Sequence, residues 1–326
     1  MTEQAAYTVF GVNHDRFNAM ALDIFRFQSK QNPVYGSYLD AIGNDPGKVQ
    51  SLLQIPFLPV RFFKSHVIKT GEFEPAAIFE SSGTTGTINS RHYVKDTALY
   101  RESFTRSFER FYGPATDWCI LALLPSYLER NNSSLVYMAN HLIRQSGHPQ
   151  SGFYLDDTDK LMQVIDLMEQ QKQKTLLLGV TFALLDLAEK YPRKLNHTVI
   201  METGGMKGRR KEMIRQDVHD VLKNAFGVNT VHSEYGMTEL LSQAYSAGEG
   251  IYKCPPWMKI VMRDEEDPFE IKEAGSGTIN VIDLANIHSC SFIATDDAGR
   301  LAADGSFEVL GRVDGSDLRG CSLMTV

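Results

Sequence analysis

Apolar residues recur at three- and four-residue spacing in the N-terminal part of the chain, a period typical of amphipathic helices. This pattern predicts helices over 12–30 and 36–54, followed by a proline-punctuated, extended segment at 55–63. A further helix is expected at 96–112. The short apolar run at 117–125 is predicted to be a buried strand, because strands covered on both faces are apolar throughout.

From residue 133 to residue 235, short apolar runs alternate with helical patterns, which is typical of a mainly parallel sheet covered by helices on both faces. The expected strands are 152–155, 174–179, 197–203 and 228–235, and the expected helices are 133–146, 157–171, 181–191 and 209–226. Ligands bind at the carboxyl ends of such strands. Gly204-Gly205 and Tyr235-Gly236 each follow one of them, so we expect a ligand site there.

After about residue 250 the pattern changes to the period-two alternation of antiparallel strands, separated by Ala-Gly and Asp-Gly turns. The predicted fold class is therefore α/β, with mainly parallel sheets flanked by helices and a smaller C-terminal β-rich subdomain at about 250–311. The predicted domain division is one α/β domain over 1–311 and a short C-terminal arm over 312–326.

The composition excludes several classes of protein. With 43% hydrophobic and 22% charged residues, the chain is close to a soluble globular average, and its net charge of −7 argues against a nucleic-acid partner. The most apolar stretch, 175–188, is shorter than the ~20 residues of a membrane span. The N-terminus has no secretory pattern, and the four cysteines lack zinc spacing. We expect a cytoplasmic protein without a membrane span or a structural metal.

The segment ESSGTTG at 80–86 combines small hydroxylated residues with two glycines. The backbone N–H groups of such a loop can surround phosphate oxygens without steric conflict. A Walker-type loop would place a lysine after the last glycine, whereas Thr87 follows Gly86 here, so that type of site is excluded. Taken alone, the segment is more typical of an ordinary turn.

Two further segments carry side chains suited to a nucleotide. In SEYGMTEL at 233–240, the ring of Tyr235 could cover an adenine, Thr238 could bond a phosphate and Glu239 could hold Mg²⁺. Further along, Asp297 could accept hydrogen bonds from ribose hydroxyls, and Arg312 could reach phosphate or ribose oxygens. Taken alone, the first segment is better explained as a strand end with a helix cap, and the second as a hairpin.

The order and spacing of the three segments resemble the adenylate-forming superfamily. YGMTE follows ESSGTTG by roughly 150 residues, and TDDAGR follows about 55 residues later with GRVDG close behind. Those enzymes attack the α-phosphate of ATP with a carboxylate and form an acyl-adenylate. This resemblance covers roughly residues 55–326. Within that superfamily the chain is similar to LuxE-type acyl-protein synthetases in the segments SSGTTG with SRH, PSYLERNNSSLVYM, ETGGMKGRR and RGCSL.

The resemblance implies a role for each matching residue. The phosphate-binding loop would consist of Ser81, Ser82, Gly83, Thr84, Thr85 and Gly86. The adenine site would be formed by Gly204, Gly205, Tyr235 and Gly236. Thr238 would contact a phosphate and Glu239 the Mg²⁺ ion, both as catalytic residues. Asp297 matches the ribose-binding aspartate and Arg312 the arginine that follows it. Where the superfamily reads Thr-Gly-Asp, this chain reads Thr295-Asp296-Asp297, so Asp296 stays a second candidate for the ribose contact.

The resemblance also implies a departure near the C-terminus. Superfamily ligases continue into a mobile domain that carries a catalytic lysine, whereas this sequence ends fourteen residues after Arg312. In LuxE-type proteins a cysteine near the C-terminus accepts the acyl group, and Cys321 lies at that place. The nearby Arg312 and Arg319 would favour its thiolate, which is the nucleophile. We therefore expect Cys321 to be the catalytic acyl carrier; an inert cysteine in a final strand is the alternative.

The expected function is the ATP- and Mg²⁺-dependent activation of a carboxylic acid, fatty or otherwise hydrophobic, followed by transfer to a protein cysteine as a thioester. An acyl-acceptor protein such as a fatty acyl reductase would be the partner. Two alternatives stay open. The chain could be a phenylacetate-type acyl- or aryl-CoA ligase that lacks its C-terminal domain, or a catalytically inactive nucleotide-binding homologue.

Overall fold

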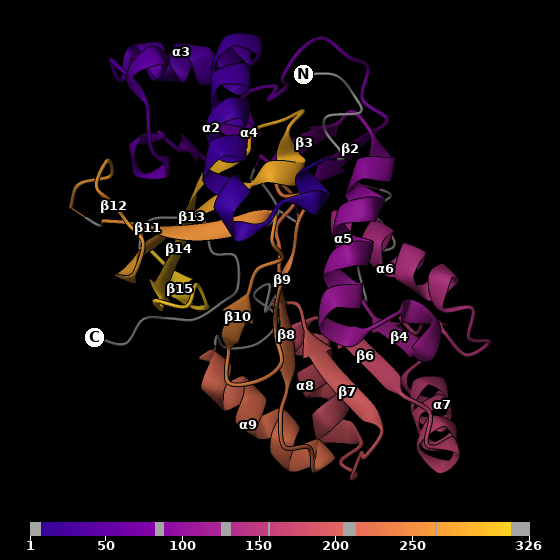
Figure 1. Ribbon diagram of the computed structural model, residues 1–326. Helices are drawn as coiled ribbons and strands as arrows, with labels where there is room; N and C mark the ends of the chain where they lie inside the picture. Colours follow the sequence, from indigo (N-terminus) through magenta and orange to yellow (C-terminus); the bar gives the residue numbers. More distant parts are fainter. Residues whose placement is uncertain are drawn as a thin grey trace. The chain divides into compact units, whose positions relative to one another are not determined.

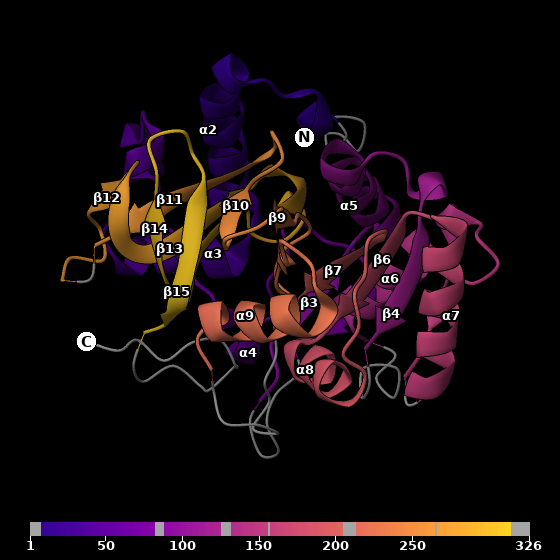
Figure 2. The same cartoon turned by 90° about the horizontal axis from the view of Figure 1, so that it is seen from below.

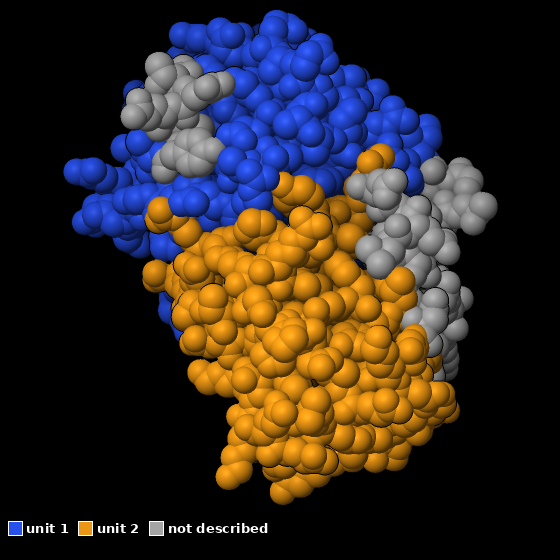
Figure 3. Space-filling model, turned by 90° about the vertical axis from the view of Figure 1, so that its right-hand side faces the viewer, with its two compact units in different colours: residues 1–104, 237–243, 253–316 blue, residues 105–236, 244–252, 317–326 orange. Residues whose placement is uncertain are grey.

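The structure is a computed structural model that describes residues 8–81, 88–124, 132–155, 157–204, 213–264 and 266–313 (Figure 1). The described residues fall into two compact units, shown in blue and orange in Figure 3. Unit 1 takes its residues from the ranges 8–104, 237–243 and 253–313, and unit 2 from 105–236 and 244–252.

Unit 2 is built on a mainly parallel sheet. Its strands are β4 (Cys119–Leu123), β5 (Gly152–Phe153), β6 (Thr175–Gly179), β7 (Thr198–Glu202), β8 (His232–Tyr235), β9 (Ala244–Ser246) and β10 (Ile251–Lys253). They lie in the order β10-β9-β8-β7-β6-β4-β5. All neighbours from β4 to β8 are parallel, whereas β9 runs antiparallel to β8. β4 and β6 are buried at every position, because both faces of the sheet are covered.

The helices of unit 2 are α5 (Thr97–Tyr112), which begins in unit 1, and α6 (Ser134–Ser146), α7 (Thr158–Gln171), α8 (Thr181–Lys190) and α9 (Arg215–Phe226). Since crossovers between parallel strands are right-handed, the strand order puts α6 on one face of the sheet and α7, α8 and α9 on the other. In Figure 2, α8 and α9 lie together on one side of the strands. Gly147 and Gly227, both with positive φ, end α6 and α9 in the left-handed conformation that glycine adopts without cost.

Unit 1 contains an antiparallel sheet in the order β12-β11-β13-β14-β15. Its strands are β11 (Met258–Arg263), β12 (Ile271–Lys272), β13 (Gly275–Asp283), β14 (Phe292–Leu301) and β15 (Phe307–Arg312). β1 (Leu58–Pro59) pairs in parallel with β14, and β2 (Ala77–Glu80) pairs with β3 (Arg91–Val94) in a separate hairpin. The helices are α2 (His14–Gln31), α3 (Pro33–Ala41) and α4 (Phe62–Ser65).

The core of unit 1 joins the N-terminal helices to the antiparallel sheet. The rings of Phe25 and Tyr35 lie 6.0 Å apart by their centroids, and each lies within 6.4 Å of the ring of Phe292 on β14. The fully buried amide of Gln28 donates to the carbonyl oxygens of Asn286 and Ile287. These contacts fix α2 against the connection between β13 and β14.

The predicted α/β fold class is confirmed, but the predicted helix over 36–54 is wrong. α3 ends at Ala41, and only two short 3₁₀ turns follow, Pro46–Lys48 and Leu52–Gln54. Gly43 has a φ of +69°, which an α-helix does not allow, and Pro46 supplies no N–H for a helical hydrogen bond. The apolar spacing of this segment therefore reflects burial of an irregular chain.

Two further predictions concern a membrane span and the division into domains. Within the ranges that the structure describes, no helix is long and apolar enough to cross a membrane. The division into 1–311 and a C-terminal arm stays a prediction, because residues 314–326 lie outside the described residues.

Candidate active site

In unit 2, the carboxyl ends of β4, β6, β7 and β8 lie at one edge of the sheet. The chain leaves β4 for β5 in one direction and β6 for β7 in the other, so the strand order reverses between β4 and β6. Such a reversal opens a crevice outside the strand ends, where α/β proteins bind ligands. Gly179 ends β6 there: a Cβ atom would lie 2.8 Å from the Leu184 side chain and 3.3 Å from the Leu123 carbonyl oxygen. A side chain at this position would therefore require Leu184 to move.

The loop that follows β7 is joined to the start of α8. The Thr203 N–H donates to the carbonyl oxygen of Gly179, and the Thr181 N–H donates to that of Gly204. Gly204 has a φ of +73°, a conformation that most side chains disfavour. Gly204 is thus held in a defined place at the strand ends, as a backbone contact to a flat base requires. Gly205 lies outside the described residues.

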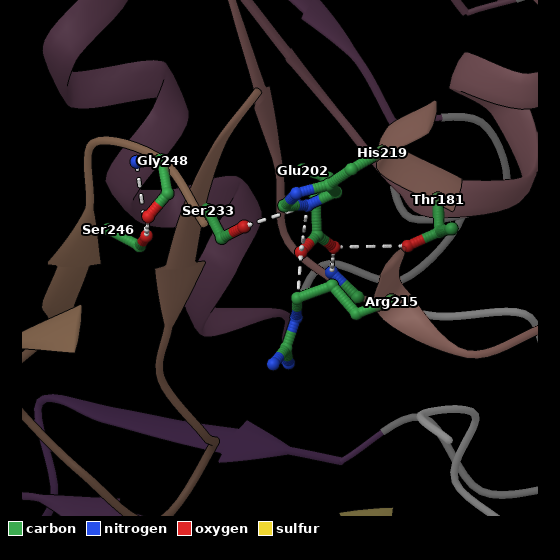
Figure 4. A network of polar contacts seen from close by, with 8 residues as sticks. Thr181, Glu202, Arg215, His219, Ser233, Ser246 and Gly248 are labelled. Atoms are coloured by element: carbon green, nitrogen blue, oxygen red, sulfur yellow. Dashed lines mark hydrogen bonds and ion pairs between the residues drawn. The ribbon is translucent and has the colours of Figure 1, made fainter. Parts of the chain in front are cut away.

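Glu202, the last residue of β7, contacts Thr181, Gly204, Arg215 and His219 at this edge of the sheet (Figure 4). Glu202 as a whole is 4% exposed, and its Oε2 accepts hydrogen bonds from the Gly204 N–H at 2.7 Å and the Thr181 hydroxyl at 3.1 Å. Its Oε1 lies 3.7 Å from both Arg215 Nε and His219 Nε2. Burial by itself would raise the pKa of this carboxyl. The contact with His219 and the charge of Arg215 outweigh that effect and lower the pKa to about 2.

Tyr235, the predicted adenine-stacking residue, ends the neighbouring strand β8 and is followed by Gly236. Its ring packs against Tyr252 of β10 edge to face, with centroids 5.9 Å apart. The guanidinium of Arg215 lies over the Tyr252 ring, 5.3 Å from its centre. Tyr252 therefore supports the Tyr235 ring, and Arg215 in turn supports Tyr252.

In unit 1, the predicted phosphate-binding loop is the connection between β2 and β3. The Ser81 N–H donates to the carbonyl oxygen of Ser90 at 3.0 Å, and the Ser90 N–H donates to Ser81 Oγ at 2.9 Å. Both serines are buried. The hairpin therefore holds the two ends of the loop together. The remaining loop residues Ser82, Gly83, Thr84, Thr85 and Gly86 lie outside the described residues.

His92 joins this hairpin to the segment that carries Thr238 and Glu239. Its Nδ1 lies 2.8 Å from the Thr238 carbonyl oxygen; this oxygen and Asn286 Oδ1 both accept, and a neutral imidazole, with one N–H, donates to one of the two. Its Nε2 lies 3.0 Å from Oδ1 of Asn286, whose amide donates to the Glu239 carbonyl oxygen. Burial lowers the pKa of His92 to about 4, so the imidazole is neutral at pH 7. His92 is thus part of the protein scaffold beside the predicted catalytic residues.

Asp297 and Arg312 meet across β14 and β15. They are direct partners in the strand register, and Arg312 Nε lies 3.4 Å from Asp297 Oδ1. Asp296 points to the other face of β14, because side chains alternate along a strand, and its carboxylate pairs with Arg61 at 3.3 Å. The structure therefore brings the predicted pair Asp297 and Arg312 together and separates Asp296 from it.

The predicted metal contact is a single carboxylate. Glu239 is fully buried, and within the described part of the chain no group of three or more His, Cys, Asp or Glu side chains could hold a metal ion. Mg²⁺ bound to a nucleotide commonly takes one or two protein carboxylates and completes its shell with phosphate oxygens and water. The residue type at 239 fits that mode of binding. Cys321 lies outside the described residues.

Sequence reasoning missed Glu202, Arg215 and Tyr252. Glu202 stands directly before the Thr203-Gly204 loop, and a carboxylate at the end of a buried strand was a signal that could have been used. Arg215 and Tyr252 carry no such signal, since their contacts with Glu202 and Tyr235 join residues far apart in the sequence.

A family model described as acyl-protein synthetase, LuxE, matches residues 11–325. No curated protein matches the chain. Among solved structures, ATP-bound MatB from Rhodopseudomonas palustris has a TM-score of 0.55 and 19% identity, covering 74% of this chain and 49% of MatB. This chain therefore spans about half the length of MatB.

A second similar structure is 2-hydroxyisobutyryl-CoA ligase in complex with 2-HIB-AMP and CoA. Its TM-score is 0.63 and its identity 13%, covering 91% of this chain and 69% of the ligase. The same ligase in its thioesterification state has a TM-score of 0.62 and 14% identity. At these identities the similarity establishes the shared fold alone.

Proposed function

Because the chain belongs to the LuxE acyl-protein synthetase family, we propose that it activates a carboxylic acid with ATP and transfers the acyl group to a protein cysteine. The family match over 11–325 is the observation that carries this proposal. The described geometry supports it in each unit: Gly204 and Tyr235 lie at the carboxyl ends of the adjacent parallel strands β7 and β8, and Asp297 faces Arg312.

In the first step, a carboxylate oxygen of the acid attacks the α-phosphorus of ATP. The bond from this phosphorus to the oxygen that bridges to the β-phosphate breaks, and pyrophosphate leaves. The backbone N–H groups of the loop 81–86 and the hydroxyl of Thr238 stabilise the charge on the phosphate oxygens. Mg²⁺ held at Glu239 neutralises part of that charge when it is bound.

Three elements hold the nucleoside in this proposal. The backbone at Gly204 and Gly205 lies along the adenine, and the ring of Tyr235, followed by Gly236, stacks on it. The Asp297 carboxylate accepts hydrogen bonds from the ribose hydroxyls. Arg312 keeps that carboxylate in place and offsets its charge, since its guanidinium is always protonated.

In the second step, the Cys321 thiolate attacks the carbonyl carbon of the acyl-adenylate. The bond from this carbon to the phosphate oxygen breaks, AMP leaves, and the acyl group stays on sulfur as a thioester. Residues 312–326 form the arm that carries this cysteine, attached to the domain 1–311. The acid is fatty or otherwise hydrophobic, and an acceptor protein such as a fatty acyl reductase receives the acyl group.

The test is covalent labelling. The full chain is incubated with Mg²⁺, ATP and a radiolabelled long-chain acid, and hydroxylamine-sensitive label on the protein is measured together with AMP release. Wild type becomes labelled only with ATP present, whereas Cys321→Ala releases AMP slowly and stays unlabelled.

The matched control is Cys254→Ala. Cys254 is a free cysteine, and burial raises the pKa of its thiol, so it is a poor nucleophile and its removal leaves labelling unchanged. Persistent label on Cys321→Ala would exclude Cys321 as the carrier. A parallel reaction with added coenzyme A identifies a CoA ligase by acyl-CoA formation.

A further inference from the structure

A continuous set of contacts within unit 2 joins the two elements that the proposed function assigns to the adenine. From the Gly204 N–H it passes to the Glu202 carboxylate at 2.7 Å, and from there to Arg215 at 3.7 Å. Arg215 lies over the Tyr252 ring, and Tyr252 packs against Tyr235. The set thus links the strands β7, β8 and β10, the helix α9 and the loop after β7, and its contacts with Gly204 and Arg215 are made by the buried Glu202 carboxylate.

Glu202 contacts other elements besides the loop at Gly204. Thr181, the first residue of α8, donates its hydroxyl to the same oxygen that accepts from Gly204. His219 of α9 lies beside the other oxygen and also contacts Ser233 of β8 at 3.4 Å (Figure 4). One side chain therefore contacts the elements that follow β6 and β7, and reaches β8 through His219.

Burying such a carboxylate is costly unless its charge is compensated and its oxygens are hydrogen-bonded. The side chains of Glu202 and Arg215 are 6% and 17% exposed, so little solvent screens their attraction. Hydrophobic residues of similar size would fill the same space without this cost. The Glu202 carboxylate is satisfied by the Thr181 hydroxyl and the Gly204 N–H, so its contribution lies in the geometry of the segments that follow β6 and β7.

We propose that Glu202 is a positioning residue for adenine binding, which holds the Gly204 backbone and, through Arg215 and Tyr252, the ring of Tyr235 at the separation that one adenine base requires. Glu202 does not touch the nucleotide in this account. The inference rests on the proposed function only in that adenine binds at Gly204 and Tyr235.

Glu169 of α7 provides a control, because its carboxylate binds the amino end of β7, the strand whose carboxyl end is Glu202. Its carboxylate accepts from the N–H groups of Asn196 and His197 and from the Thr198 hydroxyl, at the amino end of β7. Burial raises its pKa, but the hydrogen bonds from Thr198 and Asn196 prevail and lower it. Glu169→Gln therefore removes a less buried carboxylate that also binds loop backbone, at the end of β7 opposite the predicted adenine site.

The experiment measures binding of the non-hydrolysable analogue AMP-CPP to the full chain by calorimetry at 15 °C, for wild type, Glu202→Gln, Glu202→Asp and Glu169→Gln. Glu202→Gln weakens binding about tenfold or more, since hydrogen bonds to a charged group are lost. Glu202→Asp restores part of the affinity, and Glu169→Gln binds like wild type. In steady state, the KM for ATP rises in Glu202→Gln while the KM for the acid stays within twofold.

Unchanged affinity of Glu202→Gln overturns the inference, and so does an equal loss in Glu169→Gln, which would mean a general effect of destabilising β7. If Glu202→Gln does not fold, the affinity of Arg215→Lys for AMP-CPP tests the inference instead. It keeps the charge but not the planar group over Tyr252, so a tenfold loss supports the inference and wild-type affinity overturns it. Wild type that binds AMP-CPP but forms no acyl-adenylate contradicts the proposed function alone, whereas wild type without any binding contradicts both.

Discussion

Asp297 and Arg312 are cross-strand partners on β14 and β15, and their carboxylate and guanidinium lie 3.4 Å apart with 13% and 18% of the side chains exposed. Asp296, one residue earlier, faces away and pairs with the more exposed Arg61. The two neighbouring aspartates therefore differ in what they can contact, although the sequence does not distinguish them.

Asp297→Asn is expected to raise the KM for ATP about tenfold or more, because the ribose hydroxyls lose a charged acceptor. Asp296→Asn is expected to leave it within about twofold, because its pair with Arg61 is a surface ion pair of little energy. The measurement is the ATP dependence of acyl-adenylate formation for both variants. The reverse order of effects would assign the ribose contact to Asp296.

His92→Phe is expected to lower the free energy of unfolding by about 1–3 kcal/mol, because the Thr238 carbonyl oxygen and Asn286 lose a buried partner. Urea denaturation followed by circular dichroism measures this. The control is His66→Phe, since His66 is exposed and its replacement is expected to change stability by less than about 0.5 kcal/mol. Equal stability of the two variants would show that the His92 contacts carry no net energy.

Glu234 makes the stability of the protein depend on pH. Burial, and then the charge of Glu202 on the neighbouring strand, raise the pKa of Glu234 from 4.5 to about 8. The folded protein therefore keeps a proton that the unfolded chain has already lost. The resulting stabilisation is complete below pH 4.5 and disappears as the pH rises through about 8.

Glu234→Gln imitates the protonated side chain at every pH and removes this dependence. The Tm of the variant relative to wild type is expected to rise between pH 5 and pH 8.5. Thermal unfolding in a series of buffers measures the difference, and Tm curves that run parallel over this range would contradict a raised pKa at Glu234.

Glu239→Gln is expected to increase the Mg²⁺ concentration for half-maximal acyl-adenylate formation about tenfold or more, since a neutral amide replaces a charged ligand. Chelation of Mg²⁺ with EDTA is expected to abolish the reaction in wild type. The control is Glu266→Gln, an exposed acid on the connection between β11 and β12. Identical Mg²⁺ dependence of wild type and Glu239→Gln would remove the metal role from Glu239.

The parts of the fold that could be predicted are those set by local pattern. The periodicity of 96–112 matches α5, and the apolar run at 174–179 matches β6 within one residue. The helix expected over 36–54 failed because apolar spacing was given more weight than Gly43 and Pro46, whose backbone requirements end a helix.

Some residues of the candidate site could be predicted from motif spacing, and others could not. Motif spacing selected Asp297 and Arg312, which the register of β14 and β15 brings together. It could not select Glu202 with Arg215 and Tyr252, because their contact depends on how a helix and a distant strand pack around the end of β7. It left Asp296 as a second candidate beside Asp297, and the direction of each side chain on the strand separates the two.

The central claim is that this chain forms an acyl-adenylate, and the most direct measurement is acid-dependent exchange of labelled pyrophosphate into ATP. The full chain is incubated with Mg²⁺, ATP and labelled pyrophosphate, with a panel of acids from short and aromatic to long-chain fatty acids. Exchange that requires both the acid and Mg²⁺, and that Glu239→Gln reduces, is the predicted result. Absence of exchange with every acid in the panel, from a folded protein that binds AMP-CPP, would contradict the claim.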